Sequence, residues 1–295
     1  MKIGIIGATG LIGSHLVREA KKAGHEVAGF SRRADRDIAG ADETRSIRRH
    51  DQPDFSGLDT LVVVAGASVF GLWTQEKKEA IRSSRIGLMR QVRERLAVTE
   101  NGPKRIVSAS AIGFYGDRGD EILEEGADAG SGFLAQTCID WEQEAQEIET
   151  LGLSVVMPRV GLVLAKEGPA HKMMKLGFGL GLGGRLGDGS QWMPWIHLED
   201  IVRIFLYCCE NQDLTGPLNA TAPHPETNQE FTETMARVMH RPAKIPAPKW
   251  LLQKTLGEAS DLFLGSVRAT PRRLMDDGFQ FEYETLEPAL RAVFR

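Results

Sequence analysis

The chain has 295 residues, of which 26% are charged, and a formal net charge of −4 at pH 7. This length suffices for one large α/β domain with a smaller domain appended to it. The charge balance creates no bulk basic field, so we expect neither nucleic acid nor an anionic membrane surface as a partner.

The sequence also argues against export and membrane insertion. The longest mostly apolar stretch, residues 61–73, is interrupted by glycine and serine and is shorter than the roughly 20 residues that a bilayer-spanning helix needs. We expect no signal peptide, because the apolar run at residues 3–6 continues directly into a glycine turn. Cys138, Cys208 and Cys209 have neither disulfide nor metal-ligand spacing. We therefore expect a cytoplasmic protein without a metal site.

The first thirty residues organise the chain. The apolar run leads into glycines at positions 7, 10 and 13, after which apolar residues recur at helical spacing. Glycine allows a tight turn and close approach of a pyrophosphate, and a helix N-terminus offers unpaired N–H groups and the positive end of the helix dipole. We predict a strand, turn and helix that bind a dinucleotide, rather than a turn without a ligand. The predicted cofactor contacts in this turn are Gly7, Thr9, Gly10, Leu11, Ile12 and Gly13.

The second predicted strand, residues 26–30, ends in Ser31, Arg32 and Arg33. At this place in a dinucleotide fold an acidic side chain binds the ribose 2′-hydroxyl of NAD, whereas arginine accommodates the 2′-phosphate of NADP. A guanidinium beside a hydroxyl binds a phosphate dianion well, and no carboxylate follows until Asp35. We therefore predict NADP as the cofactor, with these three residues as contacts. The alternative is a solvated basic loop.

Strands and helices alternate up to residue 160. The pattern predicts helices over residues 74–96 and 133–149 and further strands at residues 44–48, 61–64, 105–108 and 154–159. This alternation is typical of an α/β fold with a doubly wound parallel sheet of the Rossmann type and right-handed crossovers. Ligands of such sheets bind outside the carboxyl ends of the strands. Further cofactor contacts are therefore expected at Val64, Ala65, Gly66, Ser108, Val160 and Val163. Arg85, near a ligand-facing turn of the helix at residues 74–96, is a further expected contact, and the alternative for it is a surface charge.

The second half of the chain has a different character. A glycine-rich stretch at residues 176–190, followed by Trp192 and Trp195, is typical of a loop that walls a substrate site or connects two domains. The elements expected after it are a helix over 198–209, a strand at 218–220, a helix from a Thr227–Glu230 capping box to 240, a strand at 279–283 and a helix from 286. We predict a dinucleotide-binding domain of residues 1–165 plus about 195–225. The remaining residues, about 166–194 plus 226–295, would form a smaller C-terminal α/β substrate domain.

These motifs resemble the extended short-chain dehydrogenases/reductases, the superfamily of nucleotide-sugar epimerases and dehydratases. The similarity rests on GATGLIGSHL, VVVAGAS, SASAIGFYG and PRVGLVL, in that order. A closer similarity, to an atypical epimerase-like family with a small C-terminal domain of unassigned function, rests on SRR, SSR, the pair Trp141 and Glu142, PWIHLED and GEASDLFLGSVRATPRRLMDDGFQF. The resemblance covers essentially the whole chain. It implies a Rossmann fold and a small-molecule substrate, and it leaves open a homodimer through the long helices, where this superfamily pairs.

The resemblance also implies a serine after the fifth strand and a Tyr-x-x-x-Lys pair on the next helix. The tyrosine of that pair acts as general acid or base while hydride passes to or from the nicotinamide. Ser110 matches the serine, but Phe133 and Thr137 occupy the places of tyrosine and lysine. Phenylalanine cannot transfer a proton, and loss of a positioned general acid typically costs a factor of about 10² to 10⁴ in rate. The candidate replacements are Tyr115, His197 or a water held by Ser110, and we predict Ser110 and Tyr115 as the catalytic residues.

Three functions are consistent with the sequence. The first is an NADP-dependent oxidoreductase or epimerase-like enzyme for an unknown carbonyl or nucleotide-sugar-like substrate. The second is a non-catalytic NADP-binding sensor or regulatory protein of the same fold. The third is a structural protein that retains only the scaffold. We favour the first, and measurements of NADPH binding and turnover discriminate among the three.

Overall fold

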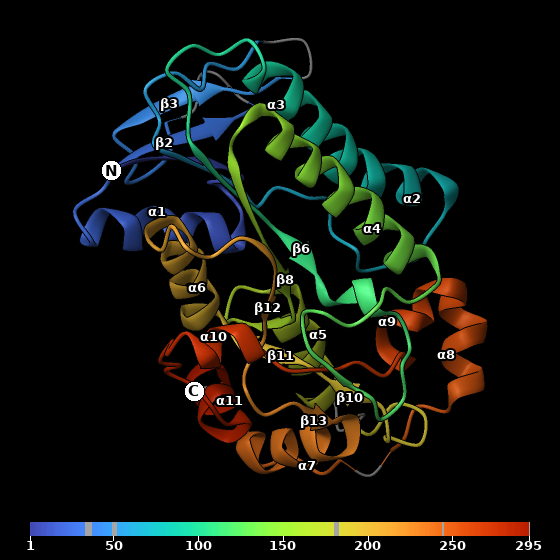
Figure 1. Ribbon diagram of the computed structural model, residues 1–295. Coiled ribbons are helices and arrows are strands. Elements are labelled where there is room, and N and C mark those ends of the chain that lie inside the picture. The colour runs from blue at the N-terminus through green and yellow to red at the C-terminus, as the bar shows by residue number, and fades with distance from the viewer. Residues whose placement is uncertain (33–36, 49–51, 180–182, 244, 295) are drawn as a thin grey trace.

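The computed structural model describes residues 1–32, 37–48, 52–179, 183–243 and 245–294. At its centre lies a parallel sheet with strand order β12-β8-β5-β4-β1-β2-β3, and β6 (Ser110–Ala111) also pairs with β8. The other strands of this sheet are β1 (Lys2–Ile6), β2 (Glu26–Ser31), β3 (Glu43–Ser46), β4 (Thr60–Val63), β5 (Arg105–Ser108), β8 (Ser154–Val160) and β12 (Gly216–Ala220). Helices cover both faces of the sheet (Figure 1). The predicted α/β fold with a doubly wound parallel sheet is confirmed.

The central strands are apolar because both faces of the sheet are covered. All four residues of β4 are buried. On one face α1 (Leu11–Lys22) packs against α6 (Leu198–Glu210), and on the other α3 (Leu88–Leu96) packs against α4 (Phe133–Gln146) (Figure 1). Leu16, Val17 and Ala20 of α1 lie at helical spacing and are buried, which fixes this helix against the sheet.

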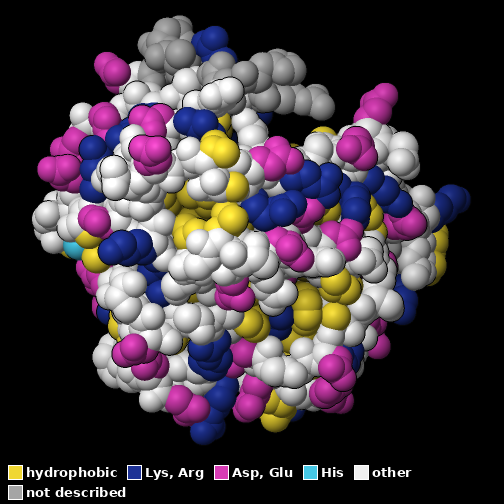
Figure 2. All heavy atoms as spheres, turned by 45° about the horizontal axis from the view of Figure 1, so that its top comes forward, with side chains coloured by type: hydrophobic (Ala, Val, Ile, Leu, Met, Phe, Trp, Pro, Cys, Tyr) yellow, Lys and Arg dark blue, Asp and Glu magenta, His cyan; other side chains and the backbone are white. Residues whose placement is uncertain are grey.

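Ion pairs connect α4 to the helices beside it. Arg90 and Arg93 both contact Glu144, at 2.5 and 3.4 Å, and Arg82 contacts Asp140 at 2.6 Å. Figure 2 shows Lys and Arg side chains beside Asp and Glu side chains on the face that includes α3 and α4. Exposed pairs of this kind contribute about 0–1 kcal/mol each. A homodimer through these two helices, which the sequence leaves open, would have to bury this charged surface.

The helix predicted over residues 74–96 is one helical path in three parts. It begins with α2 (Gln75–Arg82), capped by the Thr74 hydroxyl, which accepts the Lys77 N–H. A π-helical turn (Ser83–Gly87) follows and leads into α3. Such turns accommodate one extra residue and are frequent at functional sites. This one contains Arg85 and places it near the carboxyl end of β4.

A second, smaller core forms beyond β8. Three two-stranded pairings accompany it: β9 (Leu162–Leu164) with β11 (Trp195–His197), β10 (Trp192–Met193) with β13 (Glu226–Thr227), and β7 (Ile122–Leu123) with β14 (Arg268–Ala269). The helices of this half are α5 (Pro169–Gly179), α7 (Asn228–Met239), α8 (Lys249–Leu256), α9 (Asp261–Leu264), α10 (Arg272–Asp276) and α11 (Leu286–Phe294). Trp195, Phe231, Met235 and Leu290 are buried together in the second core. The predicted domain boundaries stay a prediction.

Three expectations about elements are corrected by the structure. Residues 279–283 form no strand, because the backbone N–H groups of Glu282 and Tyr283 donate to the Asp200 carboxylate (2.7 and 2.9 Å) rather than to another strand. The glycine-rich stretch is not a loop from its start, since residues 176–179 complete α5, where Phe178 is buried in the second core. The strand predicted at residues 44–48 ends two residues earlier, at the end of β3.

Among the described residues, no helix combines the length and apolar character needed to cross a bilayer.

Candidate functional site

The glycine turn between β1 and α1 is closely packed. Gly7 has a φ of +97°, and a Cβ there would lie 2.8 Å from Ala65 N. A Cβ on Gly13 would lie 2.1 Å from Gly7 O. The Gly10 N–H donates to Gly7 O (2.8 Å), and Gly10 is the N-cap of α1, without a side-chain cap. Uncapped N–H groups at a helix start suit an anion. The other predicted contacts of the turn are the exposed Thr9 and the partly buried Leu11 and Ile12.

Replacing Gly13 by alanine should weaken both the fold and dinucleotide binding. The new methyl group would meet Gly7 O at 2.1 Å, so α1 would have to move away from β1. We expect urea denaturation to show a loss of about 1–3 kcal/mol in the free energy of unfolding. Gly177→Ala in α5 is the control, because nothing lies within 4 Å of a Cβ there. A Gly13→Ala protein as stable as the wild type would contradict the packing described for this turn.

One arginine follows each of the neighbouring strands β2 and β3, and the side chain of the second contacts the backbone of the first. Ser31 is buried at the end of β2, and Arg32 after it is exposed. The exposed Arg48 follows β3 and donates from Nε to Arg32 O (3.2 Å). Among the residues that the structure describes, no carboxylate pairs with the guanidinium of Arg32 or Arg48. Within the described residues, this edge therefore offers two cations without a carboxylate partner to an anionic ligand.

The sequence analysis missed Arg48 as a candidate. The third strand was expected to run through residue 48, so this arginine was not counted among the residues beyond a strand end. The signal that could have found it is the basic pair after Ile47, which mirrors the basic pair after Ser31 one strand away. The predicted contact Arg33 lies outside the described residues.

The carboxyl end of β4 lies against the glycine turn. Val64 N–H donates to Ile6 O (2.9 Å), and Ala65 touches the turn at Gly7. Next to them, a Cβ on Gly66 would lie 3.1 Å from the guanidinium carbon of Arg85. The structure thus brings the predicted residues Val64, Ala65, Gly66 and Arg85 together with the turn. Val160 ends β8, and Val163 lies in the middle of β9.

The predicted catalytic serine belongs to a buried polar network. Ser110 Oγ donates to Glu142 Oε1 (2.6 Å). Arg159 donates from Nε and Nη2 to the two carboxylate oxygens of Glu142, both at 2.8 Å. All three side chains are buried. Ser108, predicted as a cofactor contact, is buried as well, with its Oγ 3.5 Å from Met89 Sδ.

The second predicted catalytic residue, Tyr115, lies in the same network. Its hydroxyl donates to Asn219 Oδ1 (2.7 Å), has Glu124 O at 3.1 Å, and accepts from Arg159 Nη1 (2.9 Å). The side chain is fully buried, and burial raises the pKa of Tyr115 above its ordinary value. These hydrogen bonds use the hydroxyl for a structural purpose inside the protein. A proton donor, in contrast, has to face a substrate.

Aromatic side chains occupy the place that the resemblance assigns to the catalytic pair. Phe133 begins α4, and its ring lies 5.1 Å from that of Trp73. Lys78 Nζ lies 5.2 Å from the Phe133 ring centroid and forms an ion pair with Glu258. Thr137 donates its hydroxyl to Phe133 O (2.7 Å) inside the helix. No proton donor replaces tyrosine at this position.

His197, the third candidate proton donor, caps α6. Its Nδ1 accepts the Glu199 N–H (3.3 Å), and its ring centroid lies 3.9 Å from that of Tyr283. Burial lowers the pKa of His197 to about 4, so the ring is neutral at pH 7. The geometry therefore gives this residue a helix-capping role.

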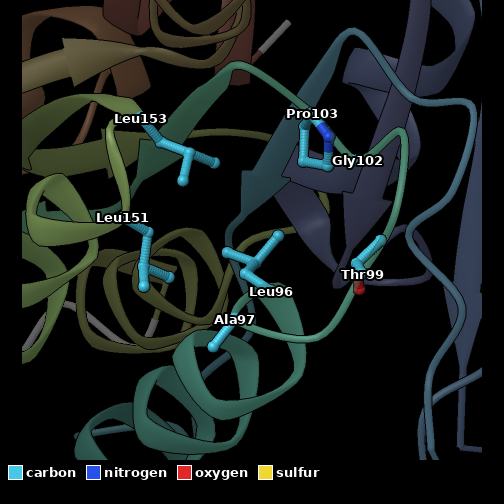
Figure 3. Close-up of a pocket in the computed structure, with 7 residues that line it drawn as sticks. All are labelled: Leu96, Ala97, Thr99, Gly102, Pro103, Leu151 and Leu153. Carbon is cyan, nitrogen blue, oxygen red and sulfur yellow. The ribbon is translucent and has the colours of Figure 1, made fainter.

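A pocket of about 280 Å³ (Figure 3) lies away from these residues. It is lined by Leu96, Ala97, Thr99, Gly102, Pro103, Leu151 and Leu153. Pro103 precedes β5 and Leu153 precedes β8, so the pocket is at the amino ends of the strands. Ligands of doubly wound sheets bind at the opposite edge, which excludes this pocket as the cofactor site. Within the described ranges, no group of His, Cys, Asp and Glu is arranged to hold a metal ion.

Comparison with known proteins agrees with this architecture. Residues 3–220 match the family model described as NAD dependent epimerase/dehydratase family, and residues 247–293 match a domain of unknown function, DUF1731. The chain is 37% identical to the epimerase family protein YfhF of Bacillus subtilis, over 98% of this chain and 97% of that protein. It is 36% identical to the epimerase family protein MT2273 of Mycobacterium tuberculosis, over 98% of this chain and 96% of that one.

Two solved structures are similar over nearly the whole chain. The human epimerase family protein SDR39U1 (isoform 2) with NADPH has a TM-score of 0.89 at 27% identity, covering 99% of both chains. The nucleoside-diphosphate sugar epimerase of Corynebacterium glutamicum has a TM-score of 0.78 at 31% identity, covering 98% of this chain and 57% of the other.

Proposed function

Because this chain belongs to the NAD dependent epimerase/dehydratase family, we propose that it is an NADP(H)-dependent oxidoreductase or epimerase-like enzyme for a carbonyl or nucleotide-sugar-like small molecule. The observation that carries the cofactor choice is the pair Arg32 and Arg48 at the ends of β2 and β3. A 2′-phosphate between them would accept charge-assisted hydrogen bonds from both. NADPH in the similar human structure supports this choice.

The residues divide into three roles in this proposal. The glycine turn and the start of α1 would hold the pyrophosphate, and Arg32 and Arg48 would hold the 2′-phosphate. The bound cofactor would supply or accept hydride. Ser110 Oγ already donates its hydrogen to Glu142, so its lone pairs are left to accept a hydrogen bond from a substrate hydroxyl or a water. We therefore assign the proton-accepting role to Ser110 with Glu142, and a structural role to Tyr115.

A non-catalytic NADP-binding sensor is the second candidate. Two observations favour it. Phe133 and Thr137 fill the place of the tyrosine and lysine pair, and the Tyr115 hydroxyl is hydrogen-bonded to Asn219 and Arg159. Such a protein would bind the cofactor as tightly as an enzyme does. It would leave the redox state of the nicotinamide unchanged.

Wild-type protein should bind NADPH more tightly than NADH and be stabilised by it. At a free NADPH concentration of 100 times Kd the free energy of unfolding should rise by about 2.7 kcal/mol, which calorimetry and thermal unfolding measure together. The protein would then be tested with a panel of carbonyl compounds and nucleotide sugars. Loss of the absorbance of the reduced nicotinamide, which reports oxidation of NADPH, would identify an enzyme. NADPH binding with no turnover across the panel would favour the sensor, and failure to bind either nucleotide would refute both.

A further inference from the structure

The Arg85 side chain is partly buried, and among the described residues no carboxylate pairs with its guanidinium. Its Nη1 donates to Ala67 O (3.0 Å) and Ile81 O (3.2 Å) and lies 3.4 Å from Ser84 Oγ. Within the described part of the chain, its Nε and Nη2 donate no hydrogen bond. Partial burial lowers the pKa of the Arg85 guanidinium, because it removes water from the charged form. Charges withdrawn from water are normally paired.

A second donor without an acceptor lies in the same place. Trp141 on α4 is 5% exposed, and its indole Nε1 has no hydrogen-bond partner among the residues that the structure describes. The guanidinium carbon of Arg85 lies 5.3 Å from the Trp141 ring centroid. Buried polar groups without a partner are rare in native proteins, so each calls for an explanation. Two donors with unused capacity side by side indicate a ligand that carries acceptors.

The position of this pair excludes the 2′-phosphate as that ligand. Arg85 lies at the end of β4, whereas Arg32 follows β2, and β1 separates these two strands in the sheet. The next residue of α4 after Trp141 is Glu142, which binds Ser110. Arg85 thus lies beside Gly66, which follows β4 next to the glycine turn, and Trp141 directly precedes the residue that binds the serine to which we assign the proton-accepting role.

We propose that Arg85 and the Trp141 indole N–H bind an anionic oxygen of the substrate, so that the substrate is a carbonyl compound that carries a carboxylate. This inference rests on the proposed function, since it places the substrate beside a bound nicotinamide. A carboxylate would neutralise the guanidinium and accept the indole hydrogen, which satisfies both groups at once. A phosphate oxygen of the cofactor is the other source of the same chemistry, and the test separates the two.

The test titrates the protein saturated with NADP⁺ with pyruvate, and in parallel with methyl pyruvate, its neutral ester. We expect pyruvate to bind and the ester to bind at least about tenfold more weakly, since a hydrogen bond to a charged group is lost. Arg85→Met should reduce pyruvate affinity by about tenfold or more. Trp141→Phe, which keeps the ring over the guanidinium, should reduce it by about fivefold. Arg82→Ala, in the same helical path but paired with Asp140 outside the site, should change nothing.

Titration with NADPH is the second arm. Under the proposal, Arg85→Met and Trp141→Phe bind NADPH as the wild type does, which also shows that both variants are folded. Weaker NADPH binding by these variants would reassign the pair to a cofactor phosphate and overturn the proposal. Pyruvate and its ester binding equally, or neither binding to a protein that takes up NADP⁺, would overturn it too. A wild-type protein that binds no nucleotide would instead refute the proposed function.

Discussion

Replacing Arg32 and Arg48 together by alanine should weaken NADPH binding by about a hundredfold or more while leaving NADH binding nearly unchanged. Each guanidinium would donate a charge-assisted hydrogen bond to the 2′-phosphate, worth roughly 1.5–3 kcal/mol, and each 1.4 kcal/mol is tenfold in affinity. NADH has a hydroxyl in place of the 2′-phosphate, so its affinity should fall little when the two arginines are removed. Calorimetric titration of both nucleotides at low and high salt measures the effect.

The single variants and the salt dependence sharpen this experiment. Arg32→Ala and Arg48→Ala should each weaken NADPH by about tenfold or more, and added salt should weaken wild-type NADPH binding more than that of the double variant, because exposed charges are screened. Arg272→Ala removes one exposed charge paired with Asp276 and is the control. Equal losses for NADPH and NADH would show that the 2′-phosphate is not bound between these two arginines.

The fold could be predicted from local patterns because those patterns have direct physical causes. Buried parallel strands read as apolar runs, and the glycines at positions 7 and 13 leave no room for a side chain. The prediction of a strand at residues 279–283 was wrong because it depended on a contact that is distant in the sequence. Its aromatic alternation is real, and Phe279 and Phe281 do pack against the main core. The backbone N–H groups of Glu282 and Tyr283, however, donate hydrogen bonds to Asp200. This residue lies about 80 positions earlier in the sequence, so no local pattern reveals the contact.

Some residues of the candidate site could be predicted from the sequence and others could not, again because some contacts are local and others are not. Residues that act through the backbone or from a strand end, such as Gly7, Gly66 and Arg32, are recognisable from their neighbours in sequence. The roles of Ser110 and Tyr115 depend on Glu142, Arg159 and Asn219, which reach them from other elements. The π-helical turn that positions Arg85 is equally hidden, since one extra residue barely changes the helical spacing of apolar side chains.

Breaking the ion pair between Glu142 and Arg159 should have the largest effect on stability of any single side-chain change proposed for this chain. Arg159→Met leaves the Glu142 carboxylate buried and without a cation, with the Ser110 hydroxyl still donating a hydrogen bond to it. It also removes the guanidinium from the Phe114 ring, whose centroid it approaches to 3.5 Å. Removing one partner of a buried pair typically costs about 3–5 kcal/mol. Urea denaturation measures the loss in the free energy of unfolding.

The double variant Glu142→Leu with Arg159→Met distinguishes a lost attraction from an uncompensated charge. If the cost of the single variant arises from the stranded carboxylate, the double variant should recover most of the lost stability, since apolar replacement of a buried pair is often neutral. Arg82→Ala, which breaks the exposed pair with Asp140, should cost at most about 1 kcal/mol. Because Ser110 donates to Glu142, the double variant should also abolish any turnover while NADPH still binds. Retained turnover would show that the proton leaves by a route other than this serine and its carboxylate.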